Sequence, residues 1–153
     1  MSTLPAAEVL GFDHVYLTVR SLDTAERFYD AVLCDVLGFR KSSFELAGAP
    51  HRQYYNRQFG NVIRPARADS SAHDPYAPGL HHLCLRVEAE PEVDRVATAL
   101  RAHGIDASPP RRLPEYAPDY YATFFSDPDG IRIEITNFRA ERRARMEHWN
   151  DPD

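Results

Sequence analysis

Cysteine is scarce in this sequence of 153 residues. The two cysteines, Cys34 and Cys84, lie far apart and form no CxxC pair. The sequence therefore indicates neither a zinc ribbon nor a disulfide framework. Lysine is scarcer still, because Lys41 is the only lysine among 18 basic residues. Such a skew toward arginine reflects genome composition more often than function.

Long apolar runs are also missing. No segment approaches the roughly 20 apolar residues that a membrane-spanning helix needs. The first residues lack the basic, apolar and small-residue order of a signal peptide. We therefore expect a cytoplasmic protein in a reducing compartment, with no membrane partner.

A concentrated basic character is absent as well. The net charge is -5 at pH 7 and the sequence pI is about 5.8. Because nucleic-acid binding needs a basic face that neutralises phosphates, we expect no nucleic-acid partner. A small molecule is the expected partner instead.

Residues 127–135, with the sequence Asp-Pro-Asp-Gly-Ile-Arg-Ile-Glu-Ile, predict a tight turn that leads into a strand. Proline presets a backbone angle that turns use, and glycine tolerates a positive φ. Isoleucine then occupies every second position, while Arg132 and Glu134 alternate with it. The pattern predicts a sheet with one apolar face and with Glu134 on the opposite face.

The expected elements occur in the same order twice along the chain. Each half begins with an alternating strand, continues into an amphipathic helix that a glycine ends, and returns to extended segments. When the halves are aligned, His82 falls on His14 and Leu85 on Leu17. The expected segments are a first unit at 12–66 (strand 12–19, helix from Ser21 or Asp23 to Leu37, strands 39–46, 52–56 and 61–66), a polar linker at 67–78, a second unit at 79–137 (strand 81–87, helix 90–103, extended pieces 105–107 and 120–125, and the strand carrying Glu134) and a charged helix at 139–149.

This repeat is a βαβββ unit in tandem. Each unit has too few elements to bury its own sheet face, so the two units are expected to close against each other around a shared cavity. The predicted fold class is α+β within a single domain, residues 1–153. We expect the two units to form a half-open mixed β-barrel with flanking helices.

On these residues the chain resembles the vicinal oxygen chelate superfamily, which includes glyoxalases, bleomycin-resistance proteins and dioxygenases. The resemblance covers roughly residues 12–137 and implies a homodimer. The matching motifs are Asp13-His14-Val15, Phe28-Tyr29, Gly79-Leu80-His81-His82-Leu83, and Asp127-Pro128-Asp129-Gly130 leading into Ile133-Glu134.

The resemblance implies a metal site formed by His14, His82 and Glu134. Each of these residues is expected on the face of its strand opposite the valines, leucines or isoleucines. Two imidazoles and one carboxylate suit a divalent Mn, Fe, Ni, Co or Zn ion and leave positions open for substrate or water.

The family's fourth ligand is replaced in this sequence. Glyoxalase I relatives carry an acid on the last strand of the first unit, where alignment of Gly60 with Gly130 places Arg64. This departure argues against lactoylglutathione lyase activity, although Gln53 and Gln58 stay open as alternative ligands. The guanidinium of Arg64 would suit an anionic substrate.

Further site residues follow from strand alternation and from the resemblance. Tyr121 is predicted to act as a catalytic acid or base, and Glu45, by resemblance to fosfomycin-type hydrolases, to activate water. His81 is expected on the face opposite His82, and His51 at the surface. The residues predicted to bind substrate are Arg64, Tyr16, Arg132 and Tyr116.

The leading functional hypothesis is a metal-dependent enzyme of the glyoxalase and fosfomycin-resistance type, a lyase, isomerase or epoxide-opening enzyme. Its divalent ion would chelate vicinal oxygens of a small substrate and act as a Lewis acid. Two alternatives remain open. One is an Fe(II) extradiol-type dioxygenase, and the other is a metal-free protein that confers resistance by binding an antibiotic.

Overall fold

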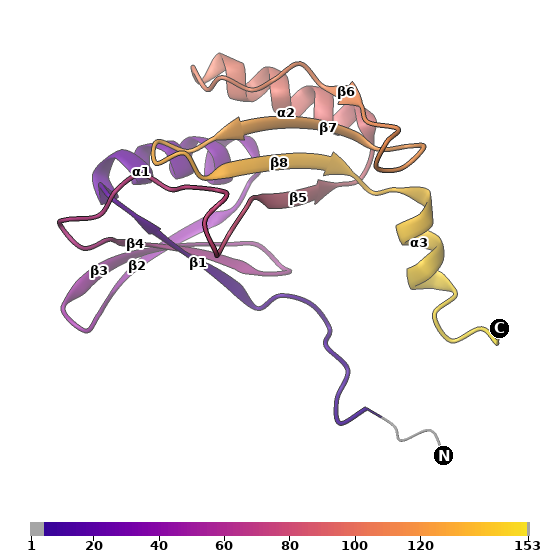
Figure 1. The fold of residues 1–153 in the computed structure, drawn as a ribbon, viewed down its shortest axis with the longest axis horizontal. Helices are drawn as coiled ribbons and strands as arrows, with labels where there is room; N and C mark the ends of the chain where they lie inside the picture. Colours follow the sequence, from indigo (N-terminus) through magenta and orange to yellow (C-terminus); the bar gives the residue numbers. More distant parts are fainter. Residues whose placement is uncertain (1–4, 153) are drawn as a thin grey trace.

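The computed structural model describes residues 5–152, which form two sheets with helices beside them (Figure 1). The first unit consists of β1 (His14–Val19), α1 (Leu22–Tyr29), a π-helix η1 (Asp30–Val36), β2 (Arg40–Leu46), β3 (Ala49–Tyr55) and β4 (Gly60–Pro65). The second unit consists of β5 (Leu83–Val87), α2 (Glu90–Ala102), β6 (Arg111–Arg112), β7 (Tyr121–Ser126) and β8 (Arg132–Asn137), and α3 (Ala140–Glu147) follows it.

The two sheets have the same topology. Their strand orders are β1-β4-β3-β2 and β5-β8-β7-β6. In each sheet the first and last strands of the unit run parallel, and the other neighbours are antiparallel. The predicted α+β class and tandem βαβββ units are confirmed. The half-open arrangement is confirmed too, because the sheets are not closed into one barrel (Figure 1).

Apolar residues alternate along the strands, so one face of each sheet packs against the helices. Leu17 and Val19 of β1 are 4% and 0% exposed, whereas Tyr16 on the other face is 43% exposed. The buried face of β1 meets Tyr29 of α1 and Ile133 of β8 in one hydrophobic cluster. The two units therefore share a core, and the opposite face of each sheet lies outside it.

The predicted turn at residues 127–130 is confirmed, and it ties the two units together. Gly130 has a φ of 85°, and its N–H donates to the carbonyl of Asp127 over 3.0 Å. The hydroxyl of Tyr29, in the first unit, donates to the Asp127 carboxylate over 2.9 Å. Arg20, also in the first unit, donates to both carboxylate oxygens of Asp129, from its backbone N–H and from its Nε.

This tie is buried. Tyr29 is 1% exposed and Asp127 is 5% exposed. Burial raises the pKa of the Asp127 carboxyl, and burial together with the nearby Asp127 charge raises the pKa of Tyr29 well above its usual range. Tyr29 therefore keeps its proton and acts as a hydrogen-bond donor.

Two local predictions differ from the structure. The expected helix of the first unit ends near Leu37, before Gly38, but its second half is the π-helix η1. Residues 105–107 form no strand; the short β6 pairs with β7 at Arg111–Arg112 instead. The Pro109-Pro110 pair precedes β6, and proline cannot donate to a strand ladder.

The helices are short. None of those formed by residues 5–152 combines the length and the apolar character that crossing a membrane requires.

The tie between the units predicts a stability effect. Tyr29→Phe leaves the buried Asp127 carboxylate with one hydrogen-bond donor fewer, so we expect the free energy of unfolding to fall by about 1.5–3 kcal/mol. Urea denaturation measures this change. Tyr55→Phe is the matched control, because Tyr55 lies at the surface and its change should stay within about 0.5 kcal/mol. Equal effects of the two substitutions would contradict the proposed role of the Tyr29 hydroxyl.

Candidate functional site

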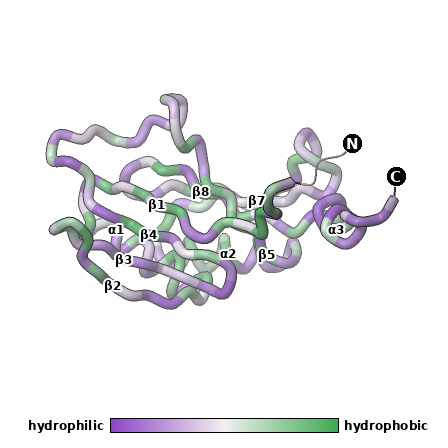
Figure 2. Tube along the Cα trace, turned by 90° about the horizontal axis from the view of Figure 1, so that it is seen from below, coloured by the Kyte–Doolittle hydropathy of each residue, from purple (hydrophilic) through white to green (hydrophobic). Residues whose placement is uncertain are grey.

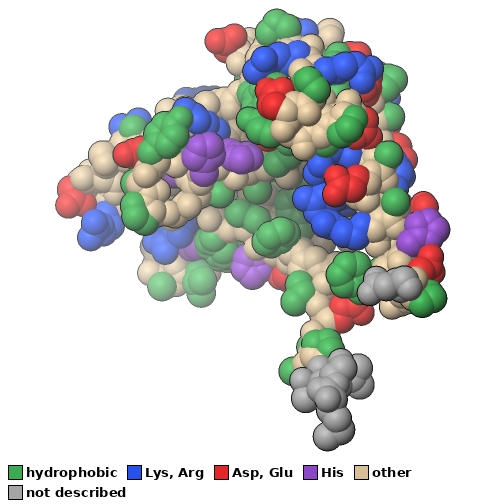
Figure 3. Space-filling model, turned by 45° about the vertical axis from the view of Figure 1, so that its right-hand side comes forward, with side chains coloured by type: hydrophobic (Ala, Val, Ile, Leu, Met, Phe, Trp, Pro, Cys, Tyr) green, Lys and Arg blue, Asp and Glu red, His purple; other side chains and the backbone are tan. Residues whose placement is uncertain are grey.

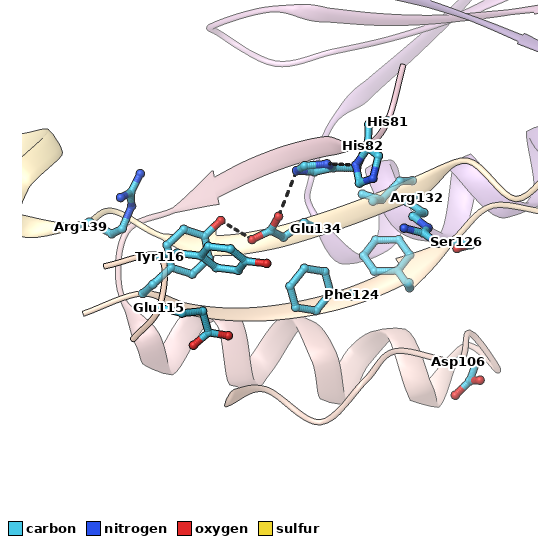
Figure 4. A pocket seen from close by; sticks show the side chains of 13 residues that line it. His81, His82, Asp106, Glu115, Tyr116, Phe124, Ser126, Arg132, Glu134 and Arg139 are labelled. Atoms are coloured by element: carbon cyan, nitrogen blue, oxygen red, sulfur yellow. Dashed lines mark hydrogen bonds and ion pairs between the residues drawn. The ribbon is translucent and has the colours of Figure 1, made fainter. Parts of the chain in front are cut away.

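A cavity of about 980 Å³ lies on the open face of the second sheet. In the space-filling view, a hollow has histidine side chains at one edge and arginine or lysine side chains at another (Figure 3). The side chains that line the cavity project from β7, β8 and the segments that flank them (Figure 4). The lining residues used below are His81, His82, Tyr116, Tyr120, Arg132, Glu134 and Arg139.

Glu134 lies at the centre of this face. Its position on β8 alternates with the buried Ile133 and Ile135, as the sequence predicts. The side chain is 5% exposed and its Oε2 lies 3.4 Å from Nε2 of His82. The other oxygen, Oε1, accepts a hydrogen bond from the Tyr120 hydroxyl. One imidazole nitrogen and one carboxylate oxygen thus converge at the cavity (Figure 4).

The expectation that His81 faces away from His82 is wrong. Nδ1 of His81 lies 2.8 Å from Nδ1 of His82, so one ring donates to the other. Strand alternation fails here because β5 begins only at Leu83, after both histidines. Tyr76, from the segment predicted as a linker, packs edge-on against His81 and accepts a hydrogen bond from Arg132 over 3.3 Å.

Cys84 is paired with Glu134 in the strand register. Loss of solvation and the nearby Glu134 charge raise the pKa of the Cys84 thiol to about 12. The thiol therefore stays protonated near neutral pH, which disfavours a nucleophilic role. Burial and the hydrogen bond to Glu134 also raise the pKa of Tyr120 above its usual range, so Tyr120 remains a donor to the carboxylate.

His14 lies on the other sheet. Its side chain is 51% exposed, and its Nδ1 contacts the Asp13 carboxylate at 2.7 Å. Tyr16 packs edge-on against the His14 ring, with 5.6 Å between the centroids. Within residues 5–152, no three His, Cys, Asp or Glu side chains are grouped closely enough to hold a metal ion. One chain therefore brings His82 and Glu134 together, but not His14.

The other predicted site residues divide between the two sheets. Tyr116 and Arg132 line the cavity. Arg64 and Glu45 are exposed on the first sheet, where the Nε of Arg64 donates to the carbonyl of Pro65. The hydroxyl of Tyr121 donates to Asp94 of α2, on the helix-covered side of the second sheet. This placement favours Tyr120 over Tyr121 as the tyrosine at the cavity.

Strand periodicity did not identify two features of these faces. Arg139 lines the cavity from the residue before α3, and its guanidinium lies 5.0 Å from the centre of the Tyr120 ring. His51, expected at the surface, is 1% exposed and stacks on Phe44. The alternation of β3 could not have indicated the buried histidine, because His51 and Tyr54 lie three residues apart and therefore on opposite faces of the strand, yet both are buried.

Comparison with known proteins gives consistent matches. Residues 11–135 match the Glyoxalase/Bleomycin resistance protein/Dioxygenase superfamily. The uncharacterized protein YaeR of Escherichia coli K12 is 28% identical over 131 residues, which cover 80% of this chain and 92% of that protein.

Two solved structures show the same fold. A glyoxylase/bleomycin resistance protein/dioxygenase domain from Frankia sp. EAN1pec has a TM-score of 0.72 and 25% identity, and the match covers 86% of this chain and all of that domain. A mutant of the fosfomycin resistance protein FosX from Listeria monocytogenes, in complex with Mn(II) and 1S,2S-dihydroxypropylphosphonic acid, has a TM-score of 0.66 and 18% identity, with coverage of 89% of this chain and 98% of FosX.

The adjacent tyrosines predict different stability effects. Tyr120→Phe removes the donor to the buried Glu134 carboxylate, so we expect a loss of about 1–2 kcal/mol in the free energy of unfolding. Tyr121→Phe removes a hydrogen bond to the exposed Asp94 and should cost about 0.5 kcal/mol or less. Chemical denaturation of both variants measures the difference. A larger loss for Tyr121→Phe would contradict the placement of Tyr120 against Glu134.

Proposed function

The chain belongs to the Glyoxalase/Bleomycin resistance protein/Dioxygenase superfamily, and on that basis we propose that it is a metal-dependent enzyme. In this proposal His82 and Glu134 hold a divalent ion at the cavity of the second sheet. A divalent ion held there would supply Lewis-acid chemistry toward neighbouring oxygens of a small substrate. The single observation that carries the proposal is the convergence of His82 Nε2 and Glu134 Oε2, 3.4 Å apart, at the cavity.

The donor set fits such an ion. A neutral imidazole and a carboxylate suit Mn, Fe, Ni, Co or Zn. Glu134 is buried, and a buried carboxylate needs a compensating positive charge or hydrogen-bond donors. Tyr120 supplies one donor and His82 lies beside the other oxygen. A cation at this point would complete the compensation.

The surrounding side chains orient these two donors. The Tyr120 hydroxyl binds one oxygen of Glu134 and leaves the other facing His82. The contact between the Nδ1 atoms of His81 and His82 directs Nε2 of His82 toward Glu134. Such neighbouring hydrogen bonds fix the ring orientation and the basicity of a ligating histidine. Tyr116 and Phe124 add an aromatic wall against which a substrate can be desolvated (Figure 4).

A homodimer would complete the site. His14 is exposed on the open face of the first sheet, where its neighbour Tyr16 is 43% exposed. The N-terminal segment and α3 lie at the same end of the molecule (Figures 1 and 2). The N-terminal segment exposes Leu10 and Phe12, α3 exposes Met146, and Trp149 is exposed just after α3. A second copy that covers these surfaces would place its own His14 opposite His82 and Glu134.

The metal site predicts a specific dependence on His82. Elemental analysis and titration of chelator-treated protein with Mn(II) should show binding by the wild type. His82→Ala should weaken that binding by more than about 100-fold, because loss of a ligand exceeds the roughly 10- to 100-fold cost of losing a neighbouring hydrogen-bond partner. His103→Ala is the matched control at an exposed histidine. Equal Mn(II) affinity of His82→Ala and His103→Ala would contradict the proposed metal site.

The same preparation separates the alternatives. Oxygen consumption with Fe(II) and a catechol would indicate a dioxygenase. Stoichiometric binding of an antibiotic without metal, unchanged by His82→Ala, would indicate a resistance protein that works by sequestration. Turnover without oxygen uptake supports the Lewis-acid enzyme.

A site shared between two chains predicts complementation. His14→Ala and His82→Ala each damage both sites of a homodimer. A heterodimer of the two variants can be selected with two different non-histidine affinity tags. One of its two sites keeps both His14 and His82, and the other site loses both. We expect it to bind half the Mn(II) of the wild-type dimer, measured by titration. A heterodimer with no more metal than either parent would show that the site does not span two chains.

A further inference from the structure

Two arginines near the end of the cavity toward α3, Arg139 of its lining and Arg86 of β5, have no acid partner among the described residues. Within residues 5–152, neither Arg139 nor Arg86 forms an ion pair or a side-chain hydrogen bond. Each guanidinium lies over an aromatic ring instead, Arg139 at 5.0 Å from the centre of Tyr120 and Arg86 at 3.8 Å from the centre of Phe138. Their positions are thus set by stacking, while their N–H donors stay unpaired.

Some other arginines of the chain are neutralised by acids. Arg20 pairs with Asp129 and Arg52 pairs with Glu26. Arg143 also lies over the Phe138 ring, at 4.0 Å, but it pairs with Glu88. Arg132 also lines the cavity without an ion pair, but it is exposed and donates to the Tyr76 hydroxyl. Arg139 is half-buried, and a half-buried guanidinium without an acid is a ready partner for an anion.

Arg139 is close to the reactive end of the cavity. It lines the cavity together with Tyr120 and Glu134, and Cys84 pairs with Glu134 in the strand register. Arg86 follows Cys84 on the same face of β5, roughly 7 Å further along the strand. The two guanidiniums therefore flank the row of Cys84 and Glu134 on the side toward α3.

We propose that Arg139, assisted by Arg86, binds the anionic group of a substrate whose remaining part lies along the aromatic wall of the cavity. The chemical class is a carboxylate, phosphonate or phosphate, whose paired oxygens match the planar fork of a guanidinium. The inference rests on the proposed function for the role of the cavity, and it replaces Arg64 by Arg139 as the anion-binding residue.

The acids of the cavity do not cancel this charge. Glu134 is occupied by Tyr120 and His82. Glu115 and Arg139 point away from each other, on opposite sides of Tyr116 (Figure 4). Asp106 lies at the far end of the cavity (Figure 4). Outside the lining, the Asp119 carboxylate accepts a hydrogen bond from the backbone N–H of Ala140, next to Arg139, over 2.7 Å, and it forms no ion pair with the guanidinium.

Calorimetric titration with three probes of similar shape tests the proposal. Phenylphosphonate and benzoate carry the two anionic groups, and benzamide is the neutral match. The protein is the full chain, both Mn(II)-loaded and chelator-treated. The variants are Arg139→Gln, Arg139→Lys and, as a control on the exposed part of α3, Arg145→Gln.

We expect Arg139→Gln to weaken binding of at least one anionic probe about tenfold or more, because a charge-assisted hydrogen bond is lost. Arg139→Lys should recover part of the affinity, while Arg145→Gln should leave it unchanged. Benzamide should bind all variants alike. The ratio of phenylphosphonate to benzoate affinity shows which anion the site prefers.

Four results would overturn the proposal: no binding of either anion by the wild type at millimolar concentration, unchanged affinity in Arg139→Gln, equal losses in Arg145→Gln, or a change in dimer dissociation in place of ligand affinity. Failure here is distinct from failure of the metal site. If only the anion site fails, Mn(II) binding still depends on His82. If only the metal site fails, chelator-treated protein still binds the anionic probes.

Discussion

The buried contacts of Asp127 and Asp129 with the first unit are the constraint on which the structure depends. Tyr29 and Arg20 bind these carboxylates, and the same turn starts β8. Because the turn is held from the other unit, the strand that carries Glu134 cannot move independently of the first sheet. A buried carboxylate that keeps its hydrogen bonds is favourable, whereas one that loses them is costly. The tie therefore links the packing of the two units to the position of the Glu134 carboxylate on β8.

The shared core leaves each unit with a functional face. The apolar side of each sheet packs against the helices and the other unit, so the polar sides point outward. The second sheet presents His82 and Glu134, whereas the first presents His14 and Tyr16. Two incomplete faces on one molecule are the geometric consequence of packing the repeats back to back. Closing a second copy over them is the simplest way in which the three predicted ligands can meet.

The cavity combines a polar centre with an aromatic wall and a basic end. Tyr120 contributes to the polar centre, the aromatic wall and the basic end. Its hydroxyl donates to Glu134, its ring packs against Tyr116, and the Arg139 guanidinium lies over its ring. One side chain thus positions the carboxylate and the proposed anion-binding group relative to each other. The spacing between metal and anionic group would then select substrates by length as well as by charge.

The sequence by itself determined the local features: the two βαβββ units, the turn at 127–130, and the placement of Glu134 opposite the isoleucines. Each depends on backbone propensities and on a period of two residues, which neighbouring residues carry. Only the tertiary structure decided that His81 touches His82, that Tyr120 and not Tyr121 meets Glu134, and that Arg139 lies over the Tyr120 ring. These depend on where β5 begins and on which side chains of distant segments come within hydrogen-bonding distance. The same reason explains why the repeat aligns His14 with His82 while the folded chain holds them on separate sheets.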